Sequence, residues 1–510
     1  MSGAHRLIIV GKGLAVFSFL ILGSALLVAQ SAPNPKQLVD EAWRAVDSTY
    51  YDPSFGGLDW PAVRDSFLAR DYASAAEAYA GIREMLGRLG DPATRFLTPQ
   101  QASALLAEFS GAPHEGVGLL EVLSLDVDEG SGAIVVVTPV PGWPAARAGL
   151  RPGDVLLSVD GASAETLGLA ETMSRLRGRP GTSVDLRIRR GENILDVRVE
   201  REGLPAMDPV DGFIREESGT KIGYVGLRQF TAEVPQRMRE LIEDLEASGA
   251  MAYVLDLRNN PGGLVPPVQG VAALFLGEAP IARLKGRTPE PSALLAEGKR
   301  LVERPVIVLV NEGSASAAEV LAGALQDHGR ALVVGMRTFG KGLAHGFQPL
   351  SDGSAVMPTM GRLETLGGRD LLDVGIAPDV VARARTSPVI DETLVVATPE
   401  DVQYRRAIEL LASTLKTRGN GGGRGSHLSP TAASASTLPG DATDHAFRTS
   451  IGGREATGST VSTRPVPRSV VAGCGYSALS GDETVGAARS ASVRARSARC
   501  CVRSPSQPPV

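Results

Sequence analysis

Short apolar runs alternate with amphipathic stretches along the C-terminal part of the chain. The runs are rich in Val, Ile and Leu, as in buried strands, and the stretches between them carry apolar residues at helical spacing. Strands that alternate with helices favour parallel β-α-β units and therefore an α/β fold. The expected strands are 222–227, 251–257, 306–310 and 331–335, and the expected helices are 234–247, 267–275 and 317–326.

The part of the chain before residue 204 has two further patterns. Residues 36–112 have the spacing of helices, which we expect at 36–51 and 73–89. Residues 113–203 combine short strands with one amphipathic helix, and Gly191-Glu192 marks a hairpin. The strands of this region are expected at 155–161, 184–189 and 194–199, and its helix at 165–176. We therefore divide the body into 36–112, 113–203 and 204–416.

The two ends of the chain differ from the body. In residues 1–31, Arg6 and Lys12 precede the apolar stretch 14–29, which is the layout of a signal peptide, with an uncleaved membrane anchor as the alternative. Either interpretation places the body outside the cytoplasm or in a lumen. Residues 417–510 are rich in Gly, Ser, Thr, Ala and Pro, so we expect disorder, with a basic interaction tail as the alternative.

Charge and cysteine content narrow the range of partners and chemistry. The tail's eleven arginines and five acidic residues give it a net charge of +6, which leaves −11 for residues 1–416. An acidic body argues against nucleic acid as a partner. All three cysteines lie in the tail, and the sequence has neither an H-E-x-x-H motif nor a Cys/His cluster. We therefore expect no thiol chemistry, no catalytic metal and no cofactor.

The candidate chemistry lies on two turns. Ser316 stands between an expected strand and an expected helix, where helix N-terminal amides can stabilise an oxyanion, but serine is also a common N-cap. Lys341 lies between two glycines just after the strand 331–335. A lysine on a tight turn against apolar surroundings loses hydration and can act as general base for a hydroxyl. The pair predicts a serine–lysine hydrolase. Spacing leaves a Ser-His-Asp triad open, with His114, His328 or His345.

The motifs around these residues resemble those of the carboxyl-terminal processing peptidases, also called tail-specific proteases. That family has S-A-S-A-x-E and F-G-K-G motifs, separated as Ser316 and Lys341 are here. Residues 256–264 (DLRNNPGGL) resemble its glycine-rich oxyanion loop, and residues 375–380 (GIAPDV) its closing signature. The match covers about residues 37–416. It is most similar to the cyanobacterial and plastid branch, whose substrate is a photosystem II reaction-centre protein with a C-terminal extension.

The resemblance implies a fold and a set of roles. The fold would be a ClpP/crotonase-like serine protease core at 204–416, with an inserted PDZ domain at 113–203 and an N-terminal helical region at 36–112. Ser316 would be the nucleophile and Lys341 the base, and the amides of Gly263 and Ala317 would be the oxyanion donors.

Three other residues near the dyad have less definite roles. Glu319 matches an acidic residue that orients the dyad, although one turn into a helix it could equally be a capping carboxylate. His345 stands where the family usually has glutamine, four residues after the lysine, and a partly exposed loop histidine is the alternative. Ser314 is expected to be a simple helix cap.

The PDZ-like region is expected to bind the substrate. Its loop 116–119 would receive the C-terminal carboxylate of a peptide that adds as a β-strand. The loop consists of Gly116, Val117, Gly118 and Leu119. Arg177 resembles an arginine that couples this domain to the catalytic site, with a solvated surface arginine as the alternative.

Together these features predict an exported serine endopeptidase that cleaves proteins near their C-termini. The expected partners are the C-terminal tails of protein substrates, membrane-associated ones included, and the expected location is the thylakoid lumen or the periplasm. One alternative is a broad tail-specific protease for quality control. The other is a non-catalytic relative that uses the PDZ domain or an apolar site for binding.

Overall fold

The structure is a computed structural model that describes residues 34–110, 124–128, 133–139, 142–203, 208–383, 396–398 and 400–420. All of these belong to one unit, Met1–Gly453. The expected signal peptide or anchor at 1–31, the loop 116–119 and residues 421–510 of the tail lie outside the described residues. Within them, none of the helices combines the length and the apolar character that crossing a membrane requires.

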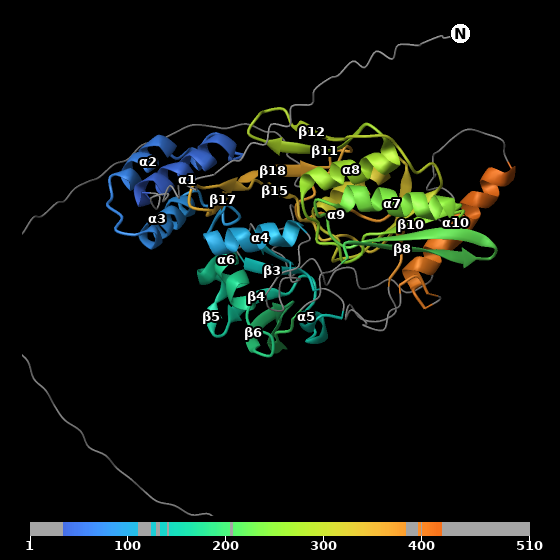
Figure 1. Ribbon diagram of the computed structural model, residues 1–510, viewed down its shortest axis with the longest axis horizontal. Coiled ribbons are helices and arrows are strands. Elements are labelled where there is room, and N and C mark those ends of the chain that lie inside the picture. The colour runs from blue at the N-terminus through green and yellow to red at the C-terminus, as the bar shows by residue number, and fades with distance from the viewer. Residues whose placement is uncertain are drawn as a thin grey trace, which may run out of the picture. The chain divides into compact units, whose positions relative to one another are not determined.

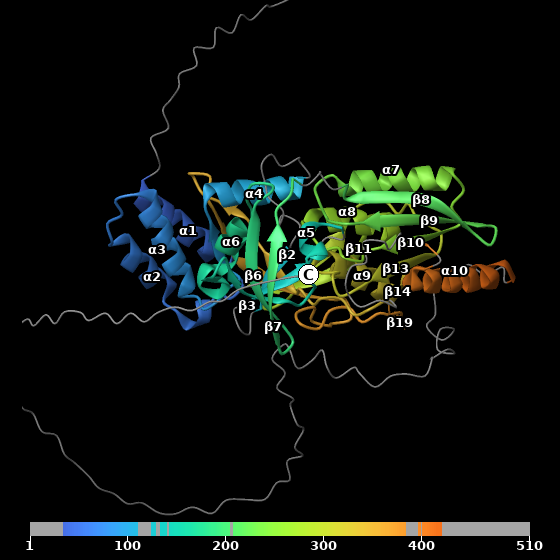
Figure 2. The ribbon, with the colours of Figure 1, turned by 90° about the horizontal axis from the view of Figure 1, so that it is seen from below.

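A six-stranded sheet in the order β19-β14-β13-β10-β9-β8 organises the C-terminal region (Figure 2). In this sheet β9, β10, β13, β14 and β19 pair in parallel, and β8 pairs antiparallel with β9. This arrangement confirms the predicted α/β class, and two predicted strands, 306–310 and 331–335, agree with β13 and β14 residue for residue. The strands are β8 (Val210–Glu217), β9 (Thr220–Leu227), β10 (Ala252–Asp256), β13 (Val306–Val310), β14 (Ala331–Gly335) and β19 (Val380–Val381).

Helices cover both faces of this sheet, because successive side chains of a strand point to opposite sides. From β10, Tyr253 and Leu255 join a core with three helices, whereas Ala252 and Val254 pack with the C-terminal helix. Figure 1 shows the ribbons of these four helices. The three helices of the first core are α7 (Val234–Ala247), α8 (Val265–Leu276) and α9 (Ala317–Asp327), and the C-terminal helix is α10 (Val402–Asn420).

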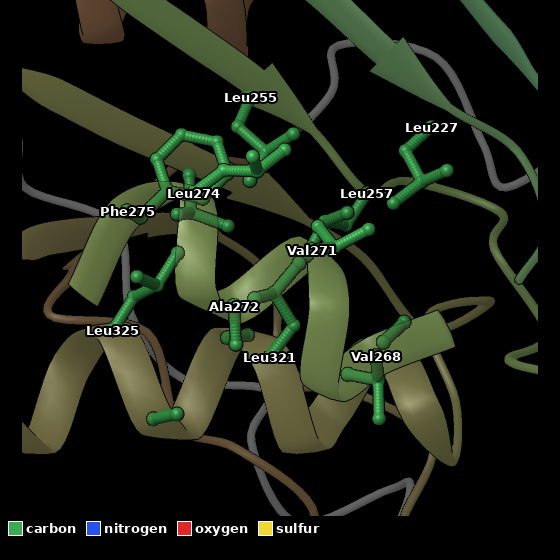
Figure 3. Packing of buried hydrophobic residues seen from close by; sticks show 14 of the residues in the cluster. Leu227, Leu255, Leu257, Val268, Val271, Ala272, Leu274, Phe275, Leu321 and Leu325 are labelled. Atoms are coloured by element: carbon green, nitrogen blue, oxygen red, sulfur yellow. The ribbon is translucent and has the colours of Figure 1, made fainter. Parts of the chain in front are cut away.

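The first core fixes α9, the helix that follows Ser316. Figure 3 shows α8 between the strands and α9, with Leu255 and Leu257 on the strand side. Leu321 and Leu325 point from α9 toward α8. Both leucines are fully buried, so the position of α9 relative to the sheet is set by packing.

A second, antiparallel sheet continues from the lysine turn, in the order β12-β11-β18-β15. Its edge strand β15 begins two residues after Lys341. The strands are β11 (Ala279–Gly286), β12 (Ser292–Ala296), β15 (Leu343–His345) and β18 (Thr359–Glu364).

The N-terminal helices enclose a hairpin from later in the chain. Leu350 and Val356, on either side of the turn between β16 and β17, are buried in the same core as Trp60 and Phe67. Strand β1 pairs with β17, giving the order β1-β17-β16. The strands are β1 (Arg95–Leu97), β16 (Gln348–Pro349) and β17 (Ala355–Met357). The helices are α1 (Pro35–Thr49), the 3₁₀ turn η1 (Phe55–Gly57), α2 (Trp60–Leu68), α3 (Ala75–Gly87) and α4 (Pro99–Ser110).

The region 113–203 contains a sheet in the order β2-β3-β4-β6-β7, with β5 paired to β4. The predicted hairpin is confirmed as β6 and β7, and the predicted helix as α6, in which Gly168 interrupts the helical backbone with a φ of 69°. The strands are β2 (Ser124–Asp128), β3 (Ala133–Thr138), β4 (Val155–Val159), β5 (Ala162–Ser163), β6 (Ser183–Arg190) and β7 (Asn193–Glu200). The helices are α5 (Pro144–Arg147) and α6 (Ala164–Leu176).

Candidate active site

The sharp turn between β13 and α9 carries Ser316. Strand β13 ends at Val310 and α9 begins at Ala317, so Ser316 occupies the N-cap position. Its φ of 53° lies in the left-handed region, which costs a residue with a side chain about 1–2 kcal/mol. The surrounding structure must therefore hold the turn in place, and the half-buried serine stands at the N-terminus of α9, beside the amide of Ala317.

The expectation that Ser314 caps the helix is wrong. Helix α9 begins only at Ala317, and Ser316 occupies the cap position. Ser314 is fully buried, and its hydroxyl donates to the carbonyl oxygen of Leu257 at 2.7 Å. It also accepts from the backbone N–H of Asn311 at 3.0 Å. Ser314 thus ties the turn to the end of β10.

Two glycines shape the turn that carries Lys341. Gly340 has a φ of 94°, which favours glycine, and a methyl group on it would lie 3.0 Å from the carbonyl carbon of Asp373. A methyl group on Gly342 would overlap the backbone of Leu372. The backbone therefore passes closely on both sides of Lys341, whose own side chain is half-buried.

Glu319 joins the serine turn to the lysine turn. Its Oε2 accepts from the backbone N–H of Ser316 at 2.8 Å and of Lys341 at 2.9 Å. Its Oε1 accepts from the hydroxyl of Thr338 at 2.5 Å and from the N–H of Gly340 at 2.8 Å. The carboxyl is fully buried, and this burial raises the pKa of Glu319 to about 7, against the lowering effect of the four hydrogen bonds.

Gly262 and Gly263 lie against the serine turn. A methyl group on Gly262 would stand 2.7 Å from Cβ of Ser316 and 2.9 Å from the nitrogen of Ala317. A methyl group on Gly263 would overlap the carbonyl oxygen of Phe230. Within the described part of the chain, the N–H groups of Gly263 and Ala317 donate to no acceptor. These two amides are thus available to a ligand beside Ser316.

The other predicted residues lie on neighbouring or separate elements. His345 ends β15, half-buried, where the pairing with β18 is irregular. Arg177 is the C-cap of α6, in the region 113–203. His328 stands at the opposite end of α9 from Ser316, with Nε2 2.8 Å from the carbonyl oxygen of Pro280, so it does not meet the serine. The loop of Gly116, Val117, Gly118 and Leu119 and also His114 lie outside the described residues.

Thr338 is a component of the site that the sequence did not single out. Its hydroxyl donates to Glu319 and accepts from the N–H of Ile376 at 2.6 Å. It thereby connects the carboxyl to the segment 375–380, which the resemblance had noted only as a closing signature. The available signal was a threonine three residues before the lysine, which alone has no distinctive chemistry.

Among the described residues, no group of three or more His, Cys, Asp or Glu is arranged to hold a metal ion. The polar groups at the site are the hydroxyls of Ser316 and Thr338, the amine of Lys341, the buried carboxyl of Glu319 and two unoccupied amides. That set can form and stabilise a tetrahedral oxyanion on a carbonyl carbon.

Three family profiles match the chain. Residues 221–382 match peptidase family S41, residues 135–190 match a PDZ domain, and residues 32–87 match the tricorn protease C1 domain. The serine turn, the lysine turn and the turn of Gly262 and Gly263, here called the glycine turn, all fall inside the first match.

Individual proteins are similar over most of the chain. A carboxyl-terminal-processing protease of Picosynechococcus sp. is 37% identical, covering 74% of this chain and 89% of its own. The chloroplastic carboxyl-terminal-processing peptidase 2 of Arabidopsis thaliana is 35% identical, covering 71% of this chain and 73% of its own. The solved structure of a photosystem II D1 C-terminal processing protease is 34% identical, with a TM-score of 0.61. The match covers 73% of this chain and 96% of that one.

Proposed function

The chain belongs to the carboxyl-terminal processing proteases of peptidase family S41, and from this we propose that Ser316 and Lys341 form its catalytic dyad. The observation that carries the proposal is the double contact of Glu319, one oxygen of which binds the backbone of both residues. A carboxyl fully buried between two turns fixes the backbone from which nucleophile and base extend. Glu319 acts as a positioning residue.

The proposed reaction proceeds in two steps. In acylation, Lys341 Nζ takes the proton of the Ser316 hydroxyl as Oγ attacks the scissile carbonyl carbon, and the oxyanion accepts from the amides of Gly263 and Ala317. The C–N bond breaks as the leaving amine receives that proton. In deacylation a water molecule, deprotonated by Lys341, attacks the ester, and the proton returns to Ser316.

The substrate class we propose is the C-terminal tail of proteins, membrane-associated ones included. The match to a PDZ domain supports it, because such domains bind peptide C-termini. In this proposal the loop Gly116–Leu119 takes the terminal carboxylate, and Arg177 couples peptide binding in the PDZ domain to the catalytic core. The similarity to chloroplastic and cyanobacterial processing proteases supports an exported location and, as the narrowest form, processing of a photosystem II reaction-centre protein. A broad quality-control role differs by cutting many unrelated tails.

The test of the dyad is a set of purified variants on one tailed peptide. We expect Ser316→Ala and Lys341→Ala each to abolish cleavage with an unchanged melting temperature, and the double variant to be no worse than either, because residues that act as a unit are not additive. His328→Ala is the matched control, since His328 is bound at the far end of α9. Cleavage that survives Lys341→Ala but not His345→Ala would overturn the lysine assignment.

The test of tail recognition uses the intact enzyme. One peptide is offered with a free carboxylate after an apolar residue, with an amidated end, and with a terminal aspartate. A site of backbone amides should favour the free apolar end, because a neutral amide accepts more weakly than a carboxylate. Equal cleavage rates would mean that the PDZ domain does not select tails.

A further inference from the structure

Asn260 is part of neither the dyad nor the oxyanion pair, yet it joins the segments that carry them. Its side chain is fully buried. The amide nitrogen donates to the carbonyl oxygen of Leu227, at the end of β9, at 2.9 Å, and the amide oxygen accepts from the N–H of Gly262 at 2.8 Å. Its backbone carbonyl accepts from the N–H of Ala315, in the serine turn, at 2.9 Å.

The chemistry of this position calls for an amide. One end of the side chain meets a carbonyl oxygen, which only accepts, and the other meets an N–H group, which only donates. Asparagine satisfies both with a single planar group. An ionised carboxylate of the same shape would accept from Gly262 but set a negative charge against the oxygen of Leu227, without a proton to donate.

The position of the glycine turn matters because it is already in contact with the serine turn. No methyl group would fit on Gly262 beside Cβ of Ser316 and the nitrogen of Ala317. A shift of the turn by a few tenths of an ångström would therefore change the separation of the amides of Gly263 and Ala317. An oxyanion site depends on donors that are held in place before the charge develops.

We infer that Asn260 is the positioning residue of the oxyanion site, which sets the glycine turn against the serine turn. The inference rests on the proposed function, because it takes the two amides as the oxyanion donors. Loss of the Asn260 side chain should lower kcat and leave KM nearly unchanged, since the transition state gains more from the two donors than the bound substrate does.

The test compares Asn260→Ala and Asn260→Asp with the wild type at a series of pH values. For Asn260→Ala we expect kcat to fall about 100-fold at every pH, close to the loss of one oxyanion donor. A protonated aspartic acid can donate to Leu227 and accept from Gly262 as the amide does, whereas the carboxylate cannot. The ratio of kcat for Asn260→Asp to that of the wild type should therefore rise as the pH falls.

The ratio cancels the pH dependence that the two proteins share. The charged groups on the segments around Asn260 are common to both: Arg228 follows β9, Arg258 precedes the glycine turn, and Glu319 and Lys341 lie on the facing turns. As a second measurement, the affinity for a peptidyl boronic acid, which forms a tetrahedral adduct on the serine, should fall by the same factor as kcat/KM.

Ser354→Ala is the matched control for loss of a buried hydrogen bond. Ser354 is fully buried in the β16–β17 turn, where its hydroxyl donates to Asp352, and its variant should keep wild-type kcat at a similar loss of melting temperature. Asn260→Ala with kcat within twofold of the wild type, or a pH-independent ratio for Asn260→Asp, overturns the inference. Cleavage that persists in Ser316→Ala would instead refute the proposed function.

Discussion

Glu319 combines two opposing influences in one side chain. Four donors surround its carboxyl, three of them backbone N–H groups that can only donate, and this arrangement favours the ionised form. Complete burial favours the neutral form and raises the pKa of Glu319 to about 7. The group therefore changes charge near neutral pH, at the point where the two turns of the site meet.

The first prediction is a rise in activity with pH through about 7, as Glu319 ionises and its two oxygens bind all four donors. Glu319→Gln should lower kcat about 100-fold, because the amide NH₂ would face backbone N–H groups and displace one of the turns. The measurement is the pH profile of kcat/KM for both proteins. A Glu319→Gln enzyme with wild-type kcat would contradict the positioning role of Glu319.

The same pKa predicts a stability trend of opposite direction. Because the folded protein holds the Glu319 proton more tightly than the unfolded chain does, the wild type should lose stability as the pH rises from about 4.5 to about 7. The loss relative to Glu319→Gln, which does not titrate, should be on the order of 3 kcal/mol. Urea unfolding of both proteins at pH 5 and pH 8 measures it, and a constant difference would argue against a raised pKa.

A further prediction concerns the room beside Lys341. Gly342→Ala should abolish activity and destabilise the fold by about 1–3 kcal/mol, because its methyl group would overlap the backbone of Leu372. Gly87→Ala, at the end of α3, is the control, since nothing lies within 4 Å of its methyl group. Melting temperature and kcat of both variants decide the matter. An active Gly342→Ala enzyme would show that the lysine turn can relax.

At this scale, the sequence identifies residues whose chemistry or backbone is unusual. A lysine between two glycines and a serine between a strand and a helix stand out, and the close approaches at Gly342 and Gly262 explain the glycines. Ser314 was assigned wrongly, because the sequence does not tell which residue of the turn begins the helix. The roles of Thr338 and Asn260 could not be predicted, because each binds a partner that is distant along the chain.

At the scale of elements, α10 is attached to the sheet by a buried ion cluster as well as by apolar packing. Arg258 pairs with Asp256 at 2.5 Å and with Asp401 at 2.8 Å, and all three side chains are buried. Gln403 also accepts from Arg258 at 3.0 Å. The elements that periodicity predicted lie within a few residues of their observed bounds, but α10 was not among them. Periodicity also could not predict that an arginine next to the glycine turn binds the start of this last helix.

Asp401→Asn should therefore destabilise the protein by about 3 kcal/mol, because it leaves the buried Arg258 without one of its two carboxylates. Glu409→Gln, which removes a more exposed partner of Arg406 on α10, should change stability by less than about 0.5 kcal/mol. Urea unfolding of the two variants provides the comparison. Equal effects would mean that apolar packing alone holds α10.

At the scale of the whole molecule, segments far apart in the chain complete one another. The hairpin β16–β17 supplies Leu350 and Val356 to the core of the N-terminal helices, and β1 pairs with β17. The sequence predicted the α/β class and the PDZ and helical regions, whereas the bounds 36–112, 113–203 and 204–416 stay predictions. This hairpin could not be predicted, because its apolar residues pack against helices that lie more than 250 residues earlier in the chain.

A second long-range contact reaches the serine turn from the region 113–203. Thr138 is the last residue of β3 and is fully buried, and its hydroxyl donates to the carbonyl oxygen of Gly313 at 2.7 Å. Gly313 has no room for a methyl group, which would lie 2.8 Å from Oδ1 of Asn259. The contact thus reaches a crowded part of the serine turn, three residues before Ser316.

Thr138→Val should lower kcat about fivefold, because one buried hydrogen bond is worth about 1 kcal/mol and its loss leaves the carbonyl of Gly313 without this donor. Thr138→Ser keeps the hydroxyl and should restore most of the activity. Thr172→Val, another fully buried threonine in the same region, has no hydrogen-bond partner among the described residues and should be neutral. If Thr138→Val and Thr172→Val cleave a tailed peptide equally well, the contact does not support the serine turn. If only Thr138→Val is slow, the region 113–203 supports catalysis as well as binding.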